Sequence, residues 1–187
     1  MAGLRYSVFR MRKPRLLAAG LLLWPGFWLI SPPEKPVWPL TLREGLPASL
    51  PGYAAAPTEA LPEEDENEMG SYTEVARFFQ RIESKTSTRQ FRIAIQDYSS
   101  GKDLLSALRA AVVEARRAAG VEAREAEISG HKSFVVTDHS QGRPTTLVTV
   151  IVTPSRLVLG QGANVTGDEA VQLVKRVDFA AVAAVKR

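Results

Sequence analysis

Several residue types are scarce in this chain of 187 residues, which has no cysteine, two histidines and 7% aromatic residues. Without cysteine it can form no disulfide, no zinc–cysteine site and no thiol nucleophile. A metal site would need further ligands at matching geometry, which the sequence does not place near His131 or His139. Ser140 follows His139 directly, and neighbouring residues do not meet as a catalytic pair. We therefore expect no catalytic residue, no metal, no cofactor and no enzyme.

The main part of the chain also lacks a concentrated block of positive charge. Residues 71–187 carry seventeen basic and twelve acidic groups, a modest and dispersed surplus, whereas residues 59–70 carry six acidic groups and no basic one. This distribution does not favour nucleic-acid binding. Gly160-Gln-Gly162 lacks the third glycine and the lysine of a phosphate-binding loop, so no nucleotide site is predicted either.

The N-terminus, in contrast, has a strong pattern. Five basic residues and no acidic one precede an uncharged apolar run over residues 16–30. A positive flank followed by an apolar segment is typical of membrane targeting, with the flank kept in the cytoplasm. We expect a single span of the inner (cytoplasmic) membrane and a C-terminal domain outside the cytoplasm, in the periplasm. The residues expected to contact lipid are Leu16, Leu21, Leu22, Leu23, Trp24, Trp28 and Ile30.

Two interpretations of this apolar run remain open. Its 15 residues would form a helix of about 22 Å, shorter than the roughly 20 residues of a standard span and closer to a cleaved signal peptide. However, the run ends in Phe27, Trp28, Leu29 and Ile30, which do not provide the small residues that a signal peptidase needs. We favour a retained anchor over cleavage near residue 31 and secretion.

Residues 32–70 differ from the rest of the chain because they contain eight of its twelve prolines. Proline fixes φ and removes a backbone donor, so this stretch is predicted to be an extended, semi-rigid arm. Three regions are therefore expected: an anchor segment over 1–31, the arm over 32–70 and a folded domain over 71–187. Spaced apolar residues of the arm could contact a partner, namely Trp38, Leu46, Leu50 and Tyr53.

The region 71–187 has the pattern of an α+β domain. Strands are predicted over 72–82, 91–95, 124–129, 133–137, 145–152 and 156–160, with 145–152 central because it is apolar on both faces. Helices are predicted over 104–119, after the capping box Thr166–Glu169, and after a second cap at Asp178. The order β-β-α-β-β-β-β-α predicts an antiparallel sheet with two main helices on one face or edge. In the first strand, Phe78 and Phe79 point to opposite faces, so one of them could contact a partner.

This order resembles the Mog1/PsbP-like α+β group, which includes extrinsic accessory subunits of photosystems and small bacterial lipoprotein-type domains. The similarity covers residues 71–187 and depends mainly on the run from Thr145 through Gly160 to the capping box Thr166–Glu169. The resemblance implies binding rather than catalysis, and an energy-transducing complex, respiratory or photosynthetic, as the partner. It carries no functional residue over to this chain.

Three hypotheses for function follow from the sequence. The first is a non-catalytic, membrane-anchored extracytoplasmic accessory or scaffold subunit that binds a larger membrane protein complex. The second is a secreted protein that binds a small ligand or lipid, with an apolar pocket between helix 104–119 and the sheet. The third is a hydrolase, which would require a cluster of loop residues around His131 and His139.

Overall fold

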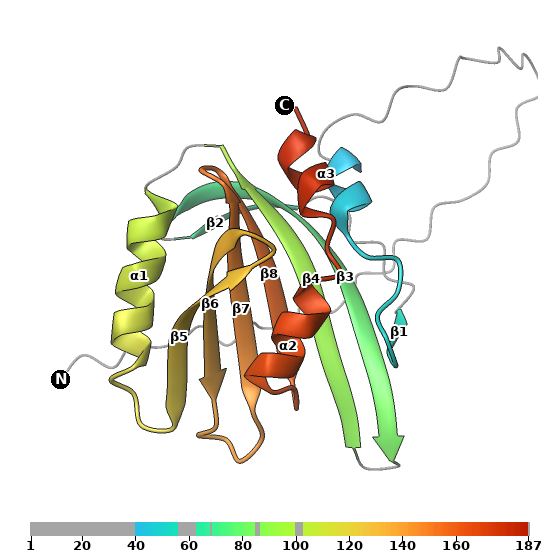
Figure 1. The fold of residues 1–187 in the computed structure, drawn as a ribbon, viewed down its shortest axis with the longest axis vertical. Helices are drawn as coiled ribbons and strands as arrows, with labels where there is room; N and C mark the ends of the chain where they lie inside the picture. The colour runs from blue at the N-terminus through green and yellow to red at the C-terminus, as the bar shows by residue number, and fades with distance from the viewer. Residues whose placement is uncertain (1–39, 56–62, 68, 85–86, 100–102, 187) are drawn as a thin grey trace, which may run out of the picture. The chain divides into compact units, whose positions relative to one another are not determined.

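An antiparallel sheet of eight strands forms the body of the structure, a computed structural model that describes residues 40–55, 63–67, 69–84, 87–99 and 103–186. The strands are β1 (Ala54–Ala55), β2 (Glu63–Asn67), β3 (Gly70–Ser84), β4 (Ser87–Tyr98), β5 (Val121–Ile128), β6 (His131–Asp138), β7 (Thr145–Thr153) and β8 (Arg156–Ala163). The spatial order is β1-β3-β4-β8-β7-β6-β5, and β2 also pairs with β3 (Figure 1).

Three α-helices and a 3₁₀ helix accompany the sheet: η1 (Leu40–Gly45), α1 (Leu104–Ala115), α2 (Gly167–Val174) and α3 (Phe179–Ala184). The α+β prediction is confirmed, and from β3 to α2 the elements follow the predicted order. The predicted central strand is β7, which lies inside the sheet between β8 and β6. No helix in the described ranges is both long and apolar enough to cross a bilayer. The predicted anchor over 16–30 lies outside these ranges.

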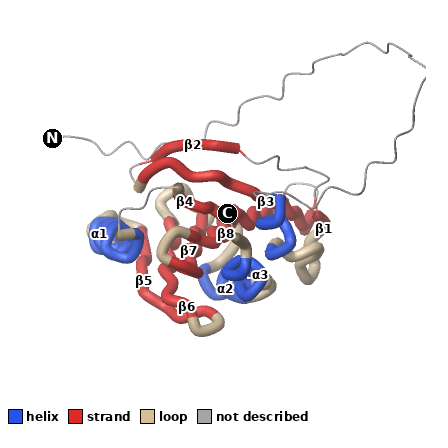
Figure 2. Tube along the Cα trace, turned by 90° about the horizontal axis from the view of Figure 1, so that it is seen from above, coloured by secondary structure: helices blue, strands red, loops and turns tan. Residues whose placement is uncertain are grey.

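The helices lie on opposite faces of the sheet, not together on one face or one edge as expected. Val158 of β8 belongs to the same apolar cluster as Val174 of α2 and Val182 of α3. Leu157, the preceding residue, belongs to a second cluster with Leu104 of α1. Successive side chains of a strand point to opposite faces, so α1 covers one face while α2 and α3 cover the other. Figure 2 shows α2 and α3 together, with α1 apart from them beside β5.

The helix boundaries follow from capping groups that the sequence predicts. The hydroxyl of Thr166 accepts a hydrogen bond from the backbone of Glu169 at 3.3 Å, and the Asp178 carboxylate accepts one from Ala181 at 2.8 Å. Both predicted caps are confirmed. Asp103 caps α1 in the same way. α1 ends at Ala115, earlier than predicted, and the next residue, Arg116, turns to donate to the backbone oxygen of Ala123 at 2.8 Å.

The main difference from the sequence prediction concerns residues 40–55, which we call the strap. Leu42, Leu46, Leu50 and Tyr53 of the strap are buried in the same cluster as Val182 of α3. The extended arm predicted over 32–70 is therefore corrected for this part, because four apolar side chains gain more by leaving water than they would as a solvated tether. The folded unit includes residues well before the expected start at residue 71.

Backbone contacts fix the strap at several points. The amide of Asp178 donates to the oxygen of Gly45 at 3.0 Å, and the guanidinium of Arg77 donates to the oxygen of Pro47 at 2.6 Å. A Cβ added to Gly45 would lie 2.4 Å from Cγ2 of Val182, so glycine is required for this close approach of η1 to α3. Proline in the strap is accommodated because its carbonyl oxygens still accept hydrogen bonds.

Candidate functional site

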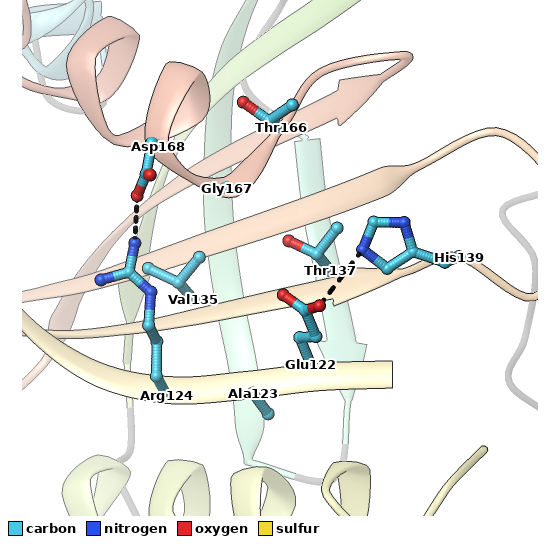
Figure 3. A pocket seen from close by; sticks show the side chains of 9 residues that line it. All are labelled: Glu122, Ala123, Arg124, Val135, Thr137, His139, Thr166, Gly167 and Asp168. Carbon is cyan, nitrogen blue, oxygen red and sulfur yellow. Dashed lines mark hydrogen bonds and ion pairs between the residues drawn. The ribbon is translucent and has the colours of Figure 1, made fainter. Parts of the chain in front are cut away.

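One concave feature in the described part of the chain lies where β5, β6 and the start of α2 come together. It is an open pocket of about 640 Å³. Its lining residues are Glu122, Ala123 and Arg124 of β5, Val135 and Thr137 of β6, His139 of the following loop, and Thr166, Gly167 and Asp168 at the start of α2 (Figure 3).

The edge strand β5 explains why this pocket is polar. Glu122, Arg124, Ala126 and Ile128 alternate along it, so they share one face of the sheet. On this face, α2 packs on β6, β7 and β8 and leaves the beginning of β5 without a helical cover, while α1 packs on the other face of β5. Glu122 and Arg124 are accordingly exposed, whereas Ile128 at the other end of the strand is fully buried. The pocket is thus the uncovered end of a face that is otherwise core.

Two side-chain contacts cross the pocket, and the second is an ion pair only when His139 is protonated. The guanidinium of Arg124 lies 2.6 Å from the carboxylate of Asp168, and Nε2 of His139 lies 3.9 Å from Glu122 (Figure 3). Both acidic side chains are more than four-fifths exposed, so water screens these pairs and each stabilises the fold by about 0–1 kcal/mol. A charged ligand that replaced one partner of either contact would therefore cost the fold little stability.

The floor of the pocket is held by a chain of hydroxyl groups. Thr146 donates to the backbone oxygen of Val165 at 2.7 Å, and its oxygen lies 3.2 Å from that of Thr137. Because Thr146 has only one proton, Thr137 is the donor of the second bond. A Cβ on Gly167 would lie 3.1 Å from Oγ1 of Thr137, so the first residue of α2 passes directly over this hydroxyl.

The two histidines do not meet in space. His131 is the first residue of β6 and its ring stacks on Phe179 of α3, with centroids 5.1 Å apart. His139 follows the last residue of the same strand and lies in the pocket. A strand rises about 3.3 Å per residue, which puts the two imidazoles at opposite ends of the sheet. The cluster that the hydrolase hypothesis requires is therefore not formed.

The loop after β6 fixes the charge next to His139. The backbone amide of Ser140 donates to the carboxylate of Asp138 at 2.8 Å. Hydrogen bonds from the side chain and backbone of Ser140 lower the pKa of Asp138 below its usual value. Asp138 therefore stays ionised over the physiological range. Within the parts of the chain that are described, no group of three or more acidic or histidine side chains could hold a metal ion.

The predicted partner contacts divide into two sets. Leu46, Leu50, Tyr53 and Phe79 are buried, so their assignment as surface contacts is corrected: they fill the core instead. Phe78 is 41% exposed and remains available for contact. Trp38 lies outside the described residues.

Tyr53 also joins the strap to α2 through a polar contact. Its hydroxyl donates to Glu169 at 3.1 Å, and the other carboxylate oxygen of Glu169 accepts from Arg89 at 2.5 Å. Arg89 lies 2.7 Å from Glu83 as well. Burial, and then the charge of Glu169, raise the pKa of Tyr53 to about 12. We call Tyr53, Glu169 and Arg89 the clasp.

The glycines before the last helices have a packing role. Gly160 and Gly162 are in β8, where an added Cβ would lie 2.3 Å from Val174 and 2.7 Å from Val165 respectively. They let α2 and the segment before it approach the sheet closely. Comparison of the chain with known protein families, with curated proteins and with solved structures finds no match.

Proposed function

We propose that this chain is a non-catalytic accessory protein, anchored in a membrane by residues 16–30, whose domain lies outside the cytoplasm and binds a larger protein complex. The basic flank and apolar run support the anchor. An energy-transducing complex is the partner class suggested by the resemblance to Mog1/PsbP-like domains, and by that resemblance alone. The structure adds a candidate surface for the contact.

The observation that supports a protein partner is an exposed apolar surface on the β3–β4 hairpin. β8 pairs with β4 only from Asp97 to Gln90, so the hairpin tip continues beyond its neighbour. Ile82 lies on this part of β3 and is 72% exposed, and Phe78, which pairs with Arg92 just before it, is 41% exposed. They are four residues apart in a strand and therefore share one face. Large apolar side chains exposed on one face of a strand, here on either side of Gln80, make this face a candidate contact site.

Arg92 strengthens this surface. Its guanidinium carbon lies 5.5 Å from the centroid of the Phe78 ring, and Arg92 also pairs with Glu74 and donates to Gln161 at 3.1 Å. These contacts hold the ring of Phe78 in place before any partner arrives. A preorganised aromatic residue beside an arginine loses little side-chain entropy on binding and is the kind of residue that dominates protein interfaces.

The proposal is tested by purifying the tagged full chain from gently solubilised membranes and quantifying the recovered proteins by mass spectrometry. We expect Phe78→Ser with Ile82→Ser to lower recovery of the partner at least about tenfold, as for loss of an interface hot spot. Val113→Ser is the matched control, because Val113 is 50% exposed on α1, outside the hairpin. Equal recovery from the hairpin variant and wild type would contradict the assignment of this surface.

The pocket supports a second candidate, the binding of a small ligand. Its charged and hydroxyl lining, including Arg124, Glu122 and Thr137, favours a polar ligand over a lipid. A ligand that binds the folded state raises its melting temperature. We expect such a shift to disappear in Arg124→Gln with Glu122→Gln; a shift that survives both changes would place the ligand elsewhere.

A further inference from the structure

We infer that the pocket between β5, β6 and the start of α2 binds a short zwitterionic ligand of the dipeptide class. Its ammonium group meets Glu122 and Thr137, and its carboxylate meets Arg124. This inference rests on the second candidate of the proposed function, the binding of a small ligand, and adds the class and the orientation of that ligand. It depends on the spacing of the pocket charges, on the hydrogen bonds that they still lack and on a buried hydroxyl group.

The two charges of β5 that line the pocket have a fixed separation. Glu122 and Arg124 are two residues apart and lie on the same face of this edge strand. β5 pairs with β6 along its whole length, so the backbone that carries both side chains is held in register. At about 3.3 Å per residue, their Cα atoms are roughly 6.6 Å apart along the strand. An extended dipeptide separates its ammonium and carboxylate groups by a similar distance, because it is also two residues of extended chain.

The negative member of this pair lacks a permanent partner. In the described part of the chain, Glu122 forms its one ion pair with His139, at 3.9 Å, and only while the imidazole is protonated. With His139 neutral, the lining carries the two carboxylates of Glu122 and Asp168 against the single guanidinium of Arg124. The pocket then has one negative charge in excess, which favours a ligand that carries a cationic group.

A buried hydroxyl group lies next to the Glu122 carboxylate. Thr137 is the register partner of Glu122 on β6, so their side chains are neighbours on one face, as Figure 3 shows. Thr137 lines the pocket although it is only 5% exposed, and it gives its proton to Thr146. Its oxygen accepts no hydrogen bond from another described residue. An ammonium group has three donors and can bind this oxygen and the Glu122 carboxylate together.

Arg124 is oriented by Asp168 but retains free donors. One terminal nitrogen, Nη2, donates to the Asp168 carboxylate at 2.6 Å, and no other described residue accepts from this side chain. A guanidinium has five N–H groups in one plane. The remaining groups can bind both oxygens of a ligand carboxylate. Asp168 thus holds the guanidinium at the pocket, and the ligand adds to this contact without replacing it.

The size and lining of the pocket agree with a peptide main chain. Pockets for small molecules occupy about 300–1,000 Å³, and this one has about 640 Å³. Apart from its polar groups, the lining consists of Ala123, Val135 and Gly167, none of which has a large side chain. The pocket therefore offers little apolar surface to an acyl chain or an aromatic ring, but it offers partners to both ends of a dipeptide.

The experiment follows the amide resonances of the isotope-labelled full chain during titration with glycylglycine. Two analogues each lack one charge: N-acetylglycylglycine keeps only the carboxylate, and glycylglycinamide keeps only the ammonium group. We expect glycylglycine to shift the amides of Ala123, Thr137 and Gly167 at millimolar concentrations. Each analogue should bind about fivefold more weakly, as for the loss of one exposed charge contact.

Two outcomes of this titration would overturn the inference. If either analogue binds as tightly as glycylglycine, the ligand class is wrong, although the pocket is still a ligand site. If none of the three probes shifts these amides, the pocket does not bind this class. The small-ligand candidate itself is decided separately by the melting-temperature test with Arg124→Gln and Glu122→Gln, so the two failures are distinguishable.

Single substitutions assign each charge to its partner. Glu122→Gln should weaken glycylglycine binding about fivefold but leave N-acetylglycylglycine unchanged, because that analogue has no ammonium group. Arg124→Gln should weaken glycylglycine but not glycylglycinamide. The matched controls are Glu127→Gln, on the opposite face of β5, and Arg109→Gln, which is 50% exposed against 53% for Arg124 and is also paired with an acidic residue. Binding that is unchanged in both pocket variants, or equally weakened in the controls, overturns the assignment.

Discussion

The strap and β2 both precede β3 along the chain and both lie against it, but different interactions hold them. The strap contributes buried side chains to the core, among them Leu42 and Leu50. β2 pairs its backbone with β3 from Glu63↔Glu74 to Asn67↔Gly70, and the side chains of Asp65 and Glu66 are exposed. Spacing of apolar residues, more than proline content, therefore determines whether a segment becomes part of the core. A segment without such spacing can still be held by backbone hydrogen bonds.

The largest expected effect in this comparison comes from Leu42→Ala. Leu42 is fully buried, so the truncation removes apolar contacts and leaves a cavity, at a cost of about 2–5 kcal/mol of unfolding free energy. Urea denaturation of the full chain measures this. Val113→Ala on the exposed side of α1 is the control and should change stability by about 0.5 kcal/mol or less. A cost below about 1 kcal/mol for Leu42→Ala would mean that the strap is a surface layer.

A smaller effect is expected from Gly45→Ala, which tests the closeness of the strap to α3. The new methyl group would lie 2.4 Å from Cγ2 of Val182. Overpacking of this kind costs about 1–3 kcal/mol. Adding Val182→Ala should relieve the clash, so that the double variant is more stable than the sum of the single effects predicts. Strict additivity of the two changes would show that η1 and α3 do not press on each other.

The order of elements could be predicted because local patterns determine it. Alternation in Phe91–Ile95 marks β4, apolar residues on both faces mark β7, and Thr166 and Asp178 begin their helices through side-chain caps. The strap could not be predicted in this way. Leu42, Leu46 and Leu50 recur at intervals of four, but Pro47 and Pro51 suggested an extended arm. The groove that buries these leucines is made by β3 and α3, which are distant in sequence.

The pocket was missed for a related reason. Glu122 and Arg124 alternate with alanine in β5, which is what a solvated edge strand also shows. They become a site only because α2 begins over Thr137 and does not cover the beginning of β5. That placement depends on tertiary packing. One part of the pocket did have a sequence signal, because Gly167 and Asp168 immediately follow the capping residue Thr166. The start of a helix was therefore predictable there, but the strands that lie next to it in space were not.

The clasp gives an intermediate effect with a pH dependence. Tyr53→Phe removes the hydrogen bond to Glu169 and should cost about 1 kcal/mol at neutral pH. The folded state holds the pKa of Tyr53 at about 12, above the ordinary value of about 10. Tyr53 therefore keeps its proton more tightly in the folded state, and its contribution is complete below about pH 10 and is lost as pH rises toward 12.

Urea unfolding of wild type and Tyr53→Phe at pH 8 and pH 11 checks this prediction. The difference in stability between the two proteins should shrink at the higher pH. Tyr72 and Tyr98, whose pKa values are also raised by burial, are present in both proteins and cancel in the comparison. A difference that is constant over this range would show that the hydroxyl of Tyr53 is not held by Glu169 in solution.

The smallest effect is expected in β2, from Asp65→Asn. Asp65 is exposed and accepts from the hydroxyl of Tyr72 at 3.3 Å, and the amide oxygen of asparagine can accept the same bond. The backbone pairing with β3 is unaffected, so the unfolding free energy should change by about 0.5 kcal/mol or less. A cost similar to that of Leu42→Ala would show that side chains, not backbone pairing, hold β2. The contrast with the strap would then fail, because both segments would be attached in the same way.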